Sequence, residues 1–286
     1  MAAMSQVCIV TDSTVQFAKS HFPGRELVTI LPLMVQFNGK VFSAEHLITL
    51  LDLPQSLPLR SQPLVQPPSR QKIEQVLHNL AQKYHEIVLI LPSRHLHPTF
   101  DFAMQVLETI RPSAAVHIID SQTTSIGLGE LVQIAAKAAQ ENVPAIEIKR
   151  HVLGLIPRVY VLFCFRSLTY LQNTGQLEVS QAVVGELLGI SPLYTLDSGK
   201  PIPLYKARSA RNLVDIFHEF ITEINDLRQL VLLQGYPPFL PEVRSLRERV
   251  QADFPEATCV EMSLSPVLGA MLGPHTLGAI GISGLE

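Results

Sequence analysis

The run IVLIL at residues 87–91 is the most informative stretch of the sequence for the fold. Five consecutive apolar residues are typical of a parallel strand that is covered on both faces. On its N-terminal side, apolar residues recur at helical spacing over 73–84, and a second helical face follows it over 103–110. The centre of the N-terminal half therefore has the pattern helix, buried strand, helix.

The same alternation continues on both sides. VCIV at 7–10 and AVHIID at 115–120 are further strand-like runs, and apolar residues over 128–139 form another helical face. Strands that alternate with helices indicate an α/β domain built on a parallel sheet.

The second half of the chain has a different pattern. Residues 185–209 read as two extended runs joined by a turn at 197–199, which favours antiparallel pairing. The other elements expected here are strands at 159–165, 230–236 and 258–264, and helices at 210–227 and 241–253. We therefore predict two domains, a parallel-sheet α/β domain at 1–150 and a mixed-sheet α/β domain at 151–286.

Composition excludes several classes of protein. The chain has 286 residues, of which 47% are hydrophobic, so it can bury a large core and is not intrinsically disordered. A net charge of −3 gives no basic surface for nucleic acid, and no apolar run is long enough to predict a transmembrane helix. The N-terminus resembles neither a signal nor a transit peptide, and three widely spaced cysteines indicate reduced thiols. We expect a cytoplasmic protein.

Motifs for several common chemistries are missing from the sequence. There is no G-x-S-x-G nucleophile elbow, no phosphate-binding P-loop and no C-x-x-C or H-E-x-x-H zinc signature. His95 and His97 are spaced as two metal ligands could be, but we expect both to be solvated loop residues. No metal site and no cofactor are predicted.

Hydroxyl and carboxyl groups follow three of the predicted strands, at Thr11-Asp12-Ser13, Ser93 and Asp120-Ser121. Ligands of open parallel sheets bind at the carboxyl ends of the strands, where such groups can anchor a carboxylate or phosphate oxygen. The alternative is that these residues cap helices or form turns, which we prefer for Asp12 and Asp120. For Ser93 both alternatives stay open.

A proline-rich stretch, PQSLPLRSQPLVQPP at 54–68, carries five prolines and reads as a loop. It is either a surface connection or a stiff binding loop, because long loops in compact domains are often functional.

Eight short motifs, taken together and in this order, resemble the DegV family of bacterial fatty-acid-binding proteins over nearly the whole chain. They are Val10-Thr11-Asp12-Ser13-Thr14, Leu31-Pro32-Leu33 with Asn38-Gly39-Lys40, Arg60-Ser61-Gln62-Pro63, Ser93 to Thr99, Ile119-Asp120-Ser121 with Ser125-x-Gly127-x-Gly129, Ser167-Leu168-x-Tyr170-Leu171 with Gly175, Leu188 to Pro192 with Gly199-Lys200 and Arg208, and Val267 to Ala270 with Gly273-Pro274. We identify the chain as a divergent member of this family.

The resemblance implies a fold and a function. It implies two α/β domains that hold a long-chain fatty acid in a tunnel between them, with Arg60, Ser61 and Ser93 at the positions that bind the carboxylate. Ser125 and His275 complete the ligand site that we expect. It further implies a protein without catalytic activity that presents the carboxylate to a separate ATP-dependent fatty acid kinase, with Arg208 as a docking residue.

Two other functions remain open on the sequence. One is a hydrolase or acyltransferase in which Ser93 or Ser61 acts with a histidine such as His275. The other is a regulatory or structural relative that has lost ligand binding, because Arg60 replaces the threonine and Met271 the histidine of the family pattern.

Overall fold

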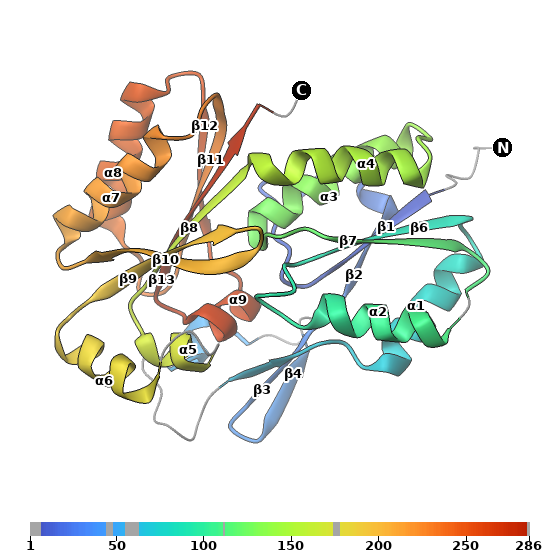
Figure 1. The fold of residues 1–286 in the computed structure, drawn as a ribbon, viewed down its shortest axis with the longest axis horizontal. Helices are drawn as coiled ribbons and strands as arrows, with labels where there is room; N and C mark the ends of the chain where they lie inside the picture. Colours follow the sequence, from blue (N-terminus) through green and yellow to red (C-terminus); the bar gives the residue numbers. More distant parts are fainter. Residues whose placement is uncertain (1–6, 44–47, 55–62, 111, 174–177, 285–286) are drawn as a thin grey trace. The chain divides into compact units, whose positions relative to one another are not determined.

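The first sheet is parallel, as the sequence predicts. The computed structural model describes residues 7–43, 48–54, 63–110, 112–173 and 178–284. The first sheet contains four strands, which hydrogen-bond in the order β2-β1-β6-β7, and every pair is parallel (Figure 1). Their bounds are Val7–Asp12 for β1, Val28–Leu31 for β2, Glu86–Leu91 for β6 and Ala115–Asp120 for β7.

Helices cover both faces of this sheet. On one face, α1 (Arg70–Ala81) and α2 (Thr99–Thr109) pack onto alternate residues of the strands, and on the other lie α3 (Ser125–Gln140) and α4 (Ala145–Leu155) (Figure 1). All five residues of the run at 87–91 are 0% exposed, which confirms the strand expected there. Each buried aliphatic side chain of this kind contributes roughly 1.5–3 kcal/mol to folding.

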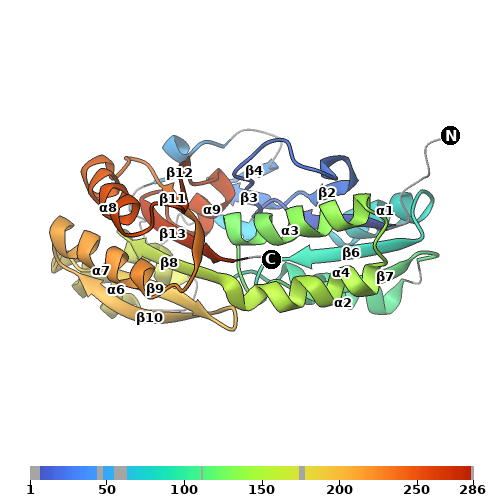
Figure 2. The same cartoon turned by 90° about the horizontal axis from the view of Figure 1, so that it is seen from above.

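The second large sheet is mixed, which confirms the predicted fold class. Its strand order is β10-β9-β8-β13-β11-β12; β11 and β12 are parallel, and the β8–β9, β8–β13 and β11–β13 pairs are antiparallel. The strands span Val159–Phe165 for β8, Ser191–Asp197 for β9, Lys200–Ala207 for β10, Leu227–Gln234 for β11, Thr258–Ser263 for β12 and Thr276–Ser283 for β13. Helices α7 (Ala210–Thr222) and α8 (Leu240–Asp253) lie side by side and bury their apolar faces on this sheet (Figure 2).

The remaining elements are short. Strands β3 (Met34–Phe37), β4 (Lys40–Ser43) and β5 (Leu64–Gln66) form a small sheet in the order β4-β3-β5, and the other helices are α5 (Leu168–Asn173), α6 (Val179–Leu187) and α9 (Pro266–Leu272). The extended stretch expected at 27–37 is thus two strands in two different sheets. Pro32 lies at the break, and a proline cannot donate to a strand ladder.

Packing groups the chain into two compact units. The first unit contains Met1–Met34, Gln66–Pro157 and Ser198–Lys200, and the second contains Val35–Val65, Arg158–Asp197 and Pro201–Glu286. The domain limits expected from the sequence are 1–150 and 151–286. They describe which segments fold on their own, whereas the two units describe packing, so these limits stay a prediction.

The three cysteines form no disulfide bond. Cys8 and Cys164 are buried, Cys259 is partly exposed, and all three are free thiols. Of the helices in the described part of the chain, none combines the length and the apolar character needed to cross a membrane.

Candidate functional site

The candidate site lies at the carboxyl edge of the parallel sheet, within the first unit. The loops that follow β1, β6 and β7 meet there, because the Ser93 N–H donates to the Thr123 carbonyl (2.8 Å) and the Gln16 N–H donates to the Ser125 carbonyl (3.2 Å). Val15 and Ser125 also form an isolated parallel bridge. The edge at which parallel sheets bind ligands is therefore built from three adjoining polar loops.

Ser93 is fully buried at the end of β6, and its hydroxyl is engaged. It donates a hydrogen bond to the Gly199 carbonyl (2.6 Å) and accepts one from the His95 N–H (3.2 Å). Gly199 has a φ of 78°, and a Cβ there would lie 2.5 Å from the Ser93 Oγ. Only glycine fits at this position, because both the backbone conformation and the close approach exclude a side chain.

Ser125 is also fully buried, at the first position of α3. Its hydroxyl donates to the Gln16 side-chain oxygen (3.0 Å). One turn further along α3, a Cβ on Gly129 would lie 1.9 Å from the Gln16 carbonyl oxygen, so the glycine lets this helix approach the loop after β1. The Ser125-x-Gly127-x-Gly129 motif therefore joins the loops that follow β1 and β7.

A buried carboxyl group lies beside these serines. Asp12 Oδ1 accepts hydrogen bonds from the Thr14 N–H (2.9 Å) and the Thr14 hydroxyl (2.5 Å), which confirms the turn expected at this residue. Asp120 Oδ1 makes the corresponding turn at the end of β7 by accepting from the Gln122 N–H (3.0 Å). Burial raises the pKa of the Asp12 carboxyl, while hydrogen bonds from Thr14 and Thr99 and the nearby His97 oppose that rise.

The expectation that His97 is a solvated loop residue is wrong. Its side chain is only 4% exposed, and Nδ1 lies 2.6 Å from the Thr99 hydroxyl, whereas His95 is exposed as expected. The chain forms a turn at 93–97, closed by the His97 N–H donating to the Ser93 carbonyl, and the ring lies near enough to Asp12 to affect its carboxyl.

Three buried threonine hydroxyls at this edge have no hydrogen-bond partner among the described residues. They are Thr11 Oγ1 near the end of β1, and Thr123 Oγ1 and Thr124 Oγ1 after β7. A buried polar atom without a partner costs roughly 1–3 kcal/mol, so a group of them at the ends of β1 and β7 favours a polar ligand. Sequence reasoning missed Thr123 and Thr124, although the run of hydroxyl residues directly after Asp120 was a usable signal.

The other predicted site residues have separate locations. Arg60 and Ser61 lie outside the described residues. His275 belongs to the second unit, where its ring packs on Phe239 with a centroid distance of 4.6 Å. Partial burial lowers the pKa of His275, the positive charge of Arg166 lowers it further, and Glu242 opposes the change.

Arg208 is exposed between β10 and α7, also in the second unit. Metal ligation has no candidate in the described ranges, which contain no group of three or more histidine, cysteine or acidic side chains suited to hold an ion.

Comparison with known proteins agrees with this architecture. In sequence, a DegV domain-containing protein of Streptococcus pyogenes is 25% identical over 276 residues, which is 94% of this chain and 95% of the relative. In structure, a fatty acid binding DegV family protein from Streptococcus agalactiae matches with a TM-score of 0.83 at 18% identity, covering 99% of this chain and all of the other (100%).

A second crystal structure, of the Streptococcus pneumoniae Fatty Acid Kinase (Fak) B3 protein loaded with linoleic acid, matches with a TM-score of 0.80 at 17% identity. It covers 98% of this chain and 100% of that protein. At such low identity the two structures establish the common fold.

The decisive finding is a family model. The family described as "Uncharacterised protein, DegV family" matches residues 6–283, nearly the whole length, which confirms the resemblance seen in the motifs. The chain belongs to the DegV family.

Proposed function

We propose that this protein binds a long-chain fatty acid and holds it without transforming it. The observation that carries the proposal is the set of buried, unpartnered polar atoms at the carboxyl edge of the parallel sheet. Two structural relatives support the same ligand class, because one is described as fatty acid binding and the other as loaded with linoleic acid.

The polar edge is suited to a carboxylate head group. A carboxylate that leaves water needs several donors, because an unpaired buried charge is strongly unfavourable. Thr11, Thr123 and Thr124 each have a hydroxyl that can donate, and all three side chains are nearly or completely buried. We retain Arg60, Ser61, Ser93, Ser125 and His275 as the proposed ligand-binding residues.

The bonding of Ser93 favours binding over nucleophilic catalysis. A serine nucleophile passes its proton to a base such as histidine. The Ser93 hydroxyl instead donates to the Gly199 carbonyl oxygen, which does not act as a base in such chemistry.

We further propose an ATP-dependent fatty acid kinase as a partner and Arg208 as a docking residue. The Arg208 side chain is exposed and makes no ion pair with any other described residue, so its charge is available to an acidic surface. An Arg208→Glu variant should bind such a kinase at least tenfold more weakly in a pull-down titration, whereas Arg244→Glu, a charge reversal on α8, should not. The three free thiols support a cytoplasmic location.

The ligand is tested by extraction and titration. The purified full-length protein is denatured, extracted with organic solvent and analysed by mass spectrometry, and the delipidated protein is titrated calorimetrically with linoleic acid. A stoichiometric fatty acid, or saturable one-site binding, is expected. An empty protein that also fails to bind linoleic, palmitic and stearic acids would overturn the proposal, and hydrolysis of acyl esters would point to the enzyme instead.

A further inference from the structure

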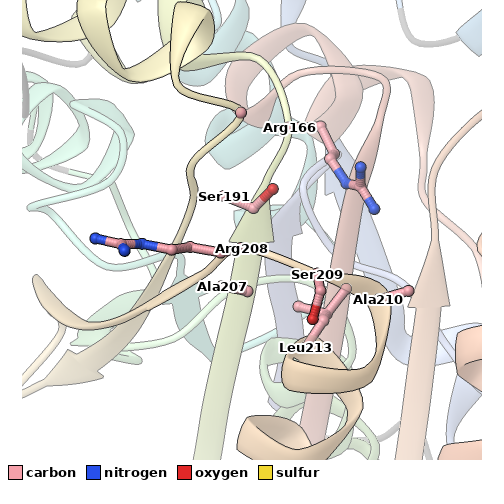
Figure 3. A pocket seen from close by; sticks show the side chains of 8 residues that line it. Arg166, Ser191, Ala207, Arg208, Ser209, Ala210 and Leu213 are labelled. Carbon is pink, nitrogen blue, oxygen red and sulfur yellow. The ribbon is translucent and has the colours of Figure 1, made fainter.

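A small cavity lies at the N-terminal end of α7, inside the second unit (Figure 3). Its volume is about 60 Å³, and its polar lining comes from Arg166 after β8, Ser191 at the start of β9, and Arg208 and Ser209 before α7. We call it the α7 pocket. A single water needs roughly 10–15 Å³ of such space, so the pocket has room for a group of several atoms.

Ser191 is the buried polar group of the α7 pocket. The residue is 8% exposed, and its hydroxyl has no hydrogen-bond partner in the part of the chain that the structure describes. In Figure 3 this hydroxyl points towards Arg166. A hydroxyl that lines the pocket and has no protein partner can donate to, or accept from, a polar group bound there.

Backbone donors lie on another side of the pocket. The Asn212 N–H donates to the Ser209 hydroxyl (3.1 Å) and the Leu213 N–H donates to the Ser209 carbonyl (2.9 Å), so Ser209 satisfies these two groups. The N–H groups of Ala210 and Arg211 remain as the unsatisfied donors of the first helical turn. With 13 residues, α7 has a helix dipole whose positive end favours an anion at this place.

Two arginines add positive charge. Arg166 has only a long contact to Glu242 (3.9 Å) and lies over the Phe239 ring at 5.0 Å, so it keeps most of its donors. Arg208 extends away from Arg166 in Figure 3, and with no ion pair among the described residues its exposed guanidinium can turn towards an anion.

We propose that the α7 pocket binds a phosphate group. The pocket offers many hydrogen-bond donors, from two guanidinium groups, the Ser191 hydroxyl and the first-turn N–H groups. This number exceeds what the two oxygens of a carboxylate can use, but it suits the oxygens of a phosphate. The ligand is either free phosphate or the phosphate of an ester, and the pocket recognises the group that both share. The proposal is independent of fatty acid binding, because none of the proposed fatty-acid-binding residues lines the α7 pocket.

Calorimetric titration of the full-length protein at constant ionic strength tests this proposal, with inorganic phosphate, methyl phosphate and acetate as probes. Inorganic phosphate should bind at one saturable site. Arg166→Gln should weaken that binding at least tenfold and Ser191→Ala by about fivefold, as expected for a charge-assisted and a neutral hydrogen bond. Arg244→Gln, which changes a well-exposed arginine on the surface of α8, is the matched control and should bind like the wild type. Unchanged thermal unfolding would show that each variant is folded.

The outcomes separate the alternatives. Binding of methyl phosphate as tightly as inorganic phosphate identifies an ester as the natural source, and binding of inorganic phosphate alone identifies the free ion. Acetate binding as tight as phosphate would overturn the assignment of ligand class. Absence of saturable phosphate binding, or wild-type affinity in both Arg166→Gln and Ser191→Ala, would overturn the site itself.

Discussion

The hydroxyl of Ser93 donates a 2.6 Å hydrogen bond to the backbone carbonyl of Gly199, a residue 106 positions further along the chain. The bond holds the turn between β9 and β10 against the end of β6, and it is fully buried on the serine side. One side chain thus has two roles, because it belongs to the candidate ligand site and also fixes a distant turn.

Replacing Ser93 should therefore affect both stability and binding. Ser93→Ala leaves the Gly199 carbonyl without this donor, and we expect a loss of roughly 1–3 kcal/mol in the free energy of unfolding. Urea denaturation measures this loss, and titration with linoleic acid measures the accompanying loss of affinity. Ser20→Ala, which removes an exposed hydroxyl bonded only to its neighbour His21, is the control. Equal stability and affinity in the two variants would contradict both roles.

Gly199→Ala should destabilise the protein more than the same change at Gly39. Both glycines have a positive φ, 78° and 71°, so each alanine pays a backbone cost of about 1–2 kcal/mol. A Cβ on Gly39 meets nothing within 4 Å, whereas one on Gly199 lies 2.5 Å from Ser93 Oγ and 2.9 Å from Gln122 Cα.

A double-mutant cycle isolates the contact between a Cβ at residue 199 and Ser93 Oγ. Ser93→Ala should relieve part of the clash in Gly199→Ala but none of the backbone cost, so the two changes should not be additive. Additive free energies of unfolding would show that the close approach does not exist in solution.

Asp12 should make stability fall as pH rises. In the folded state its pKa is raised above 3.8, the ordinary value of an aspartate, so the folded protein holds this proton more tightly than the unfolded chain does. The resulting stabilisation is complete below pH 3.8 and is lost as pH rises through the folded-state pKa. Relative to wild type, Asp12→Asn should therefore become more stable with increasing pH, as measured by urea denaturation in a pH series.

Asp52→Asn is the control with the opposite sign. Hydrogen bonds from the Thr49 N–H and hydroxyl lower the pKa of the Asp52 carboxyl, so its contribution is present above the unfolded pKa and is lost as pH falls. The two variants should deviate from wild type in opposite directions. A pH-independent difference for Asp12→Asn would contradict the raised pKa.

The three thiols should differ in reactivity. Burial raises the pKa of Cys8 and of Cys164 to about 12, so almost no thiolate is present near neutral pH. We expect an aromatic disulfide reagent to label at most one thiol in the native protein, at Cys259, and all three after unfolding in urea. A Cys259→Ser variant should lose the native labelling, and rapid native labelling of more than one thiol would contradict the packing.

Arg60 should act as a charged anchor for the ligand carboxylate. A guanidinium can form a bidentate, charge-assisted pair roughly twice as strong as a neutral hydrogen bond, and we expect the five prolines of 54–68 to limit the entropy lost on binding. We expect Arg60→Ala to weaken linoleic acid binding about tenfold or more, measured beside Ser93→Ala. Wild-type affinity in Arg60→Ala together with weak binding in Ser93→Ala would show that Arg60 is a surface residue.

The sequence by itself determined the family, three strands of the parallel sheet (β1, β6 and β7) and the three helices α1, α2 and α3. Continuous apolar runs such as 87–91 and the helical faces around them are local patterns in the sequence. The spacing of their apolar residues depends on the type of element and on how many of its faces are buried. The turn at Asp12 was predictable for the same reason, since its partner Thr14 is only two residues away.

Only the tertiary structure decided which polar groups meet. The Ser93–Gly199 bond, the burial of His97 beside Asp12 and the unpartnered hydroxyls of Thr123 and Thr124 depend on strand order and on loops that converge from distant parts of the chain. The division of 27–37 between two sheets has the same origin. Local periodicity shows which side chains leave water, but the partner of each buried polar group depends on how sheets and loops pack, which no single stretch of sequence encodes.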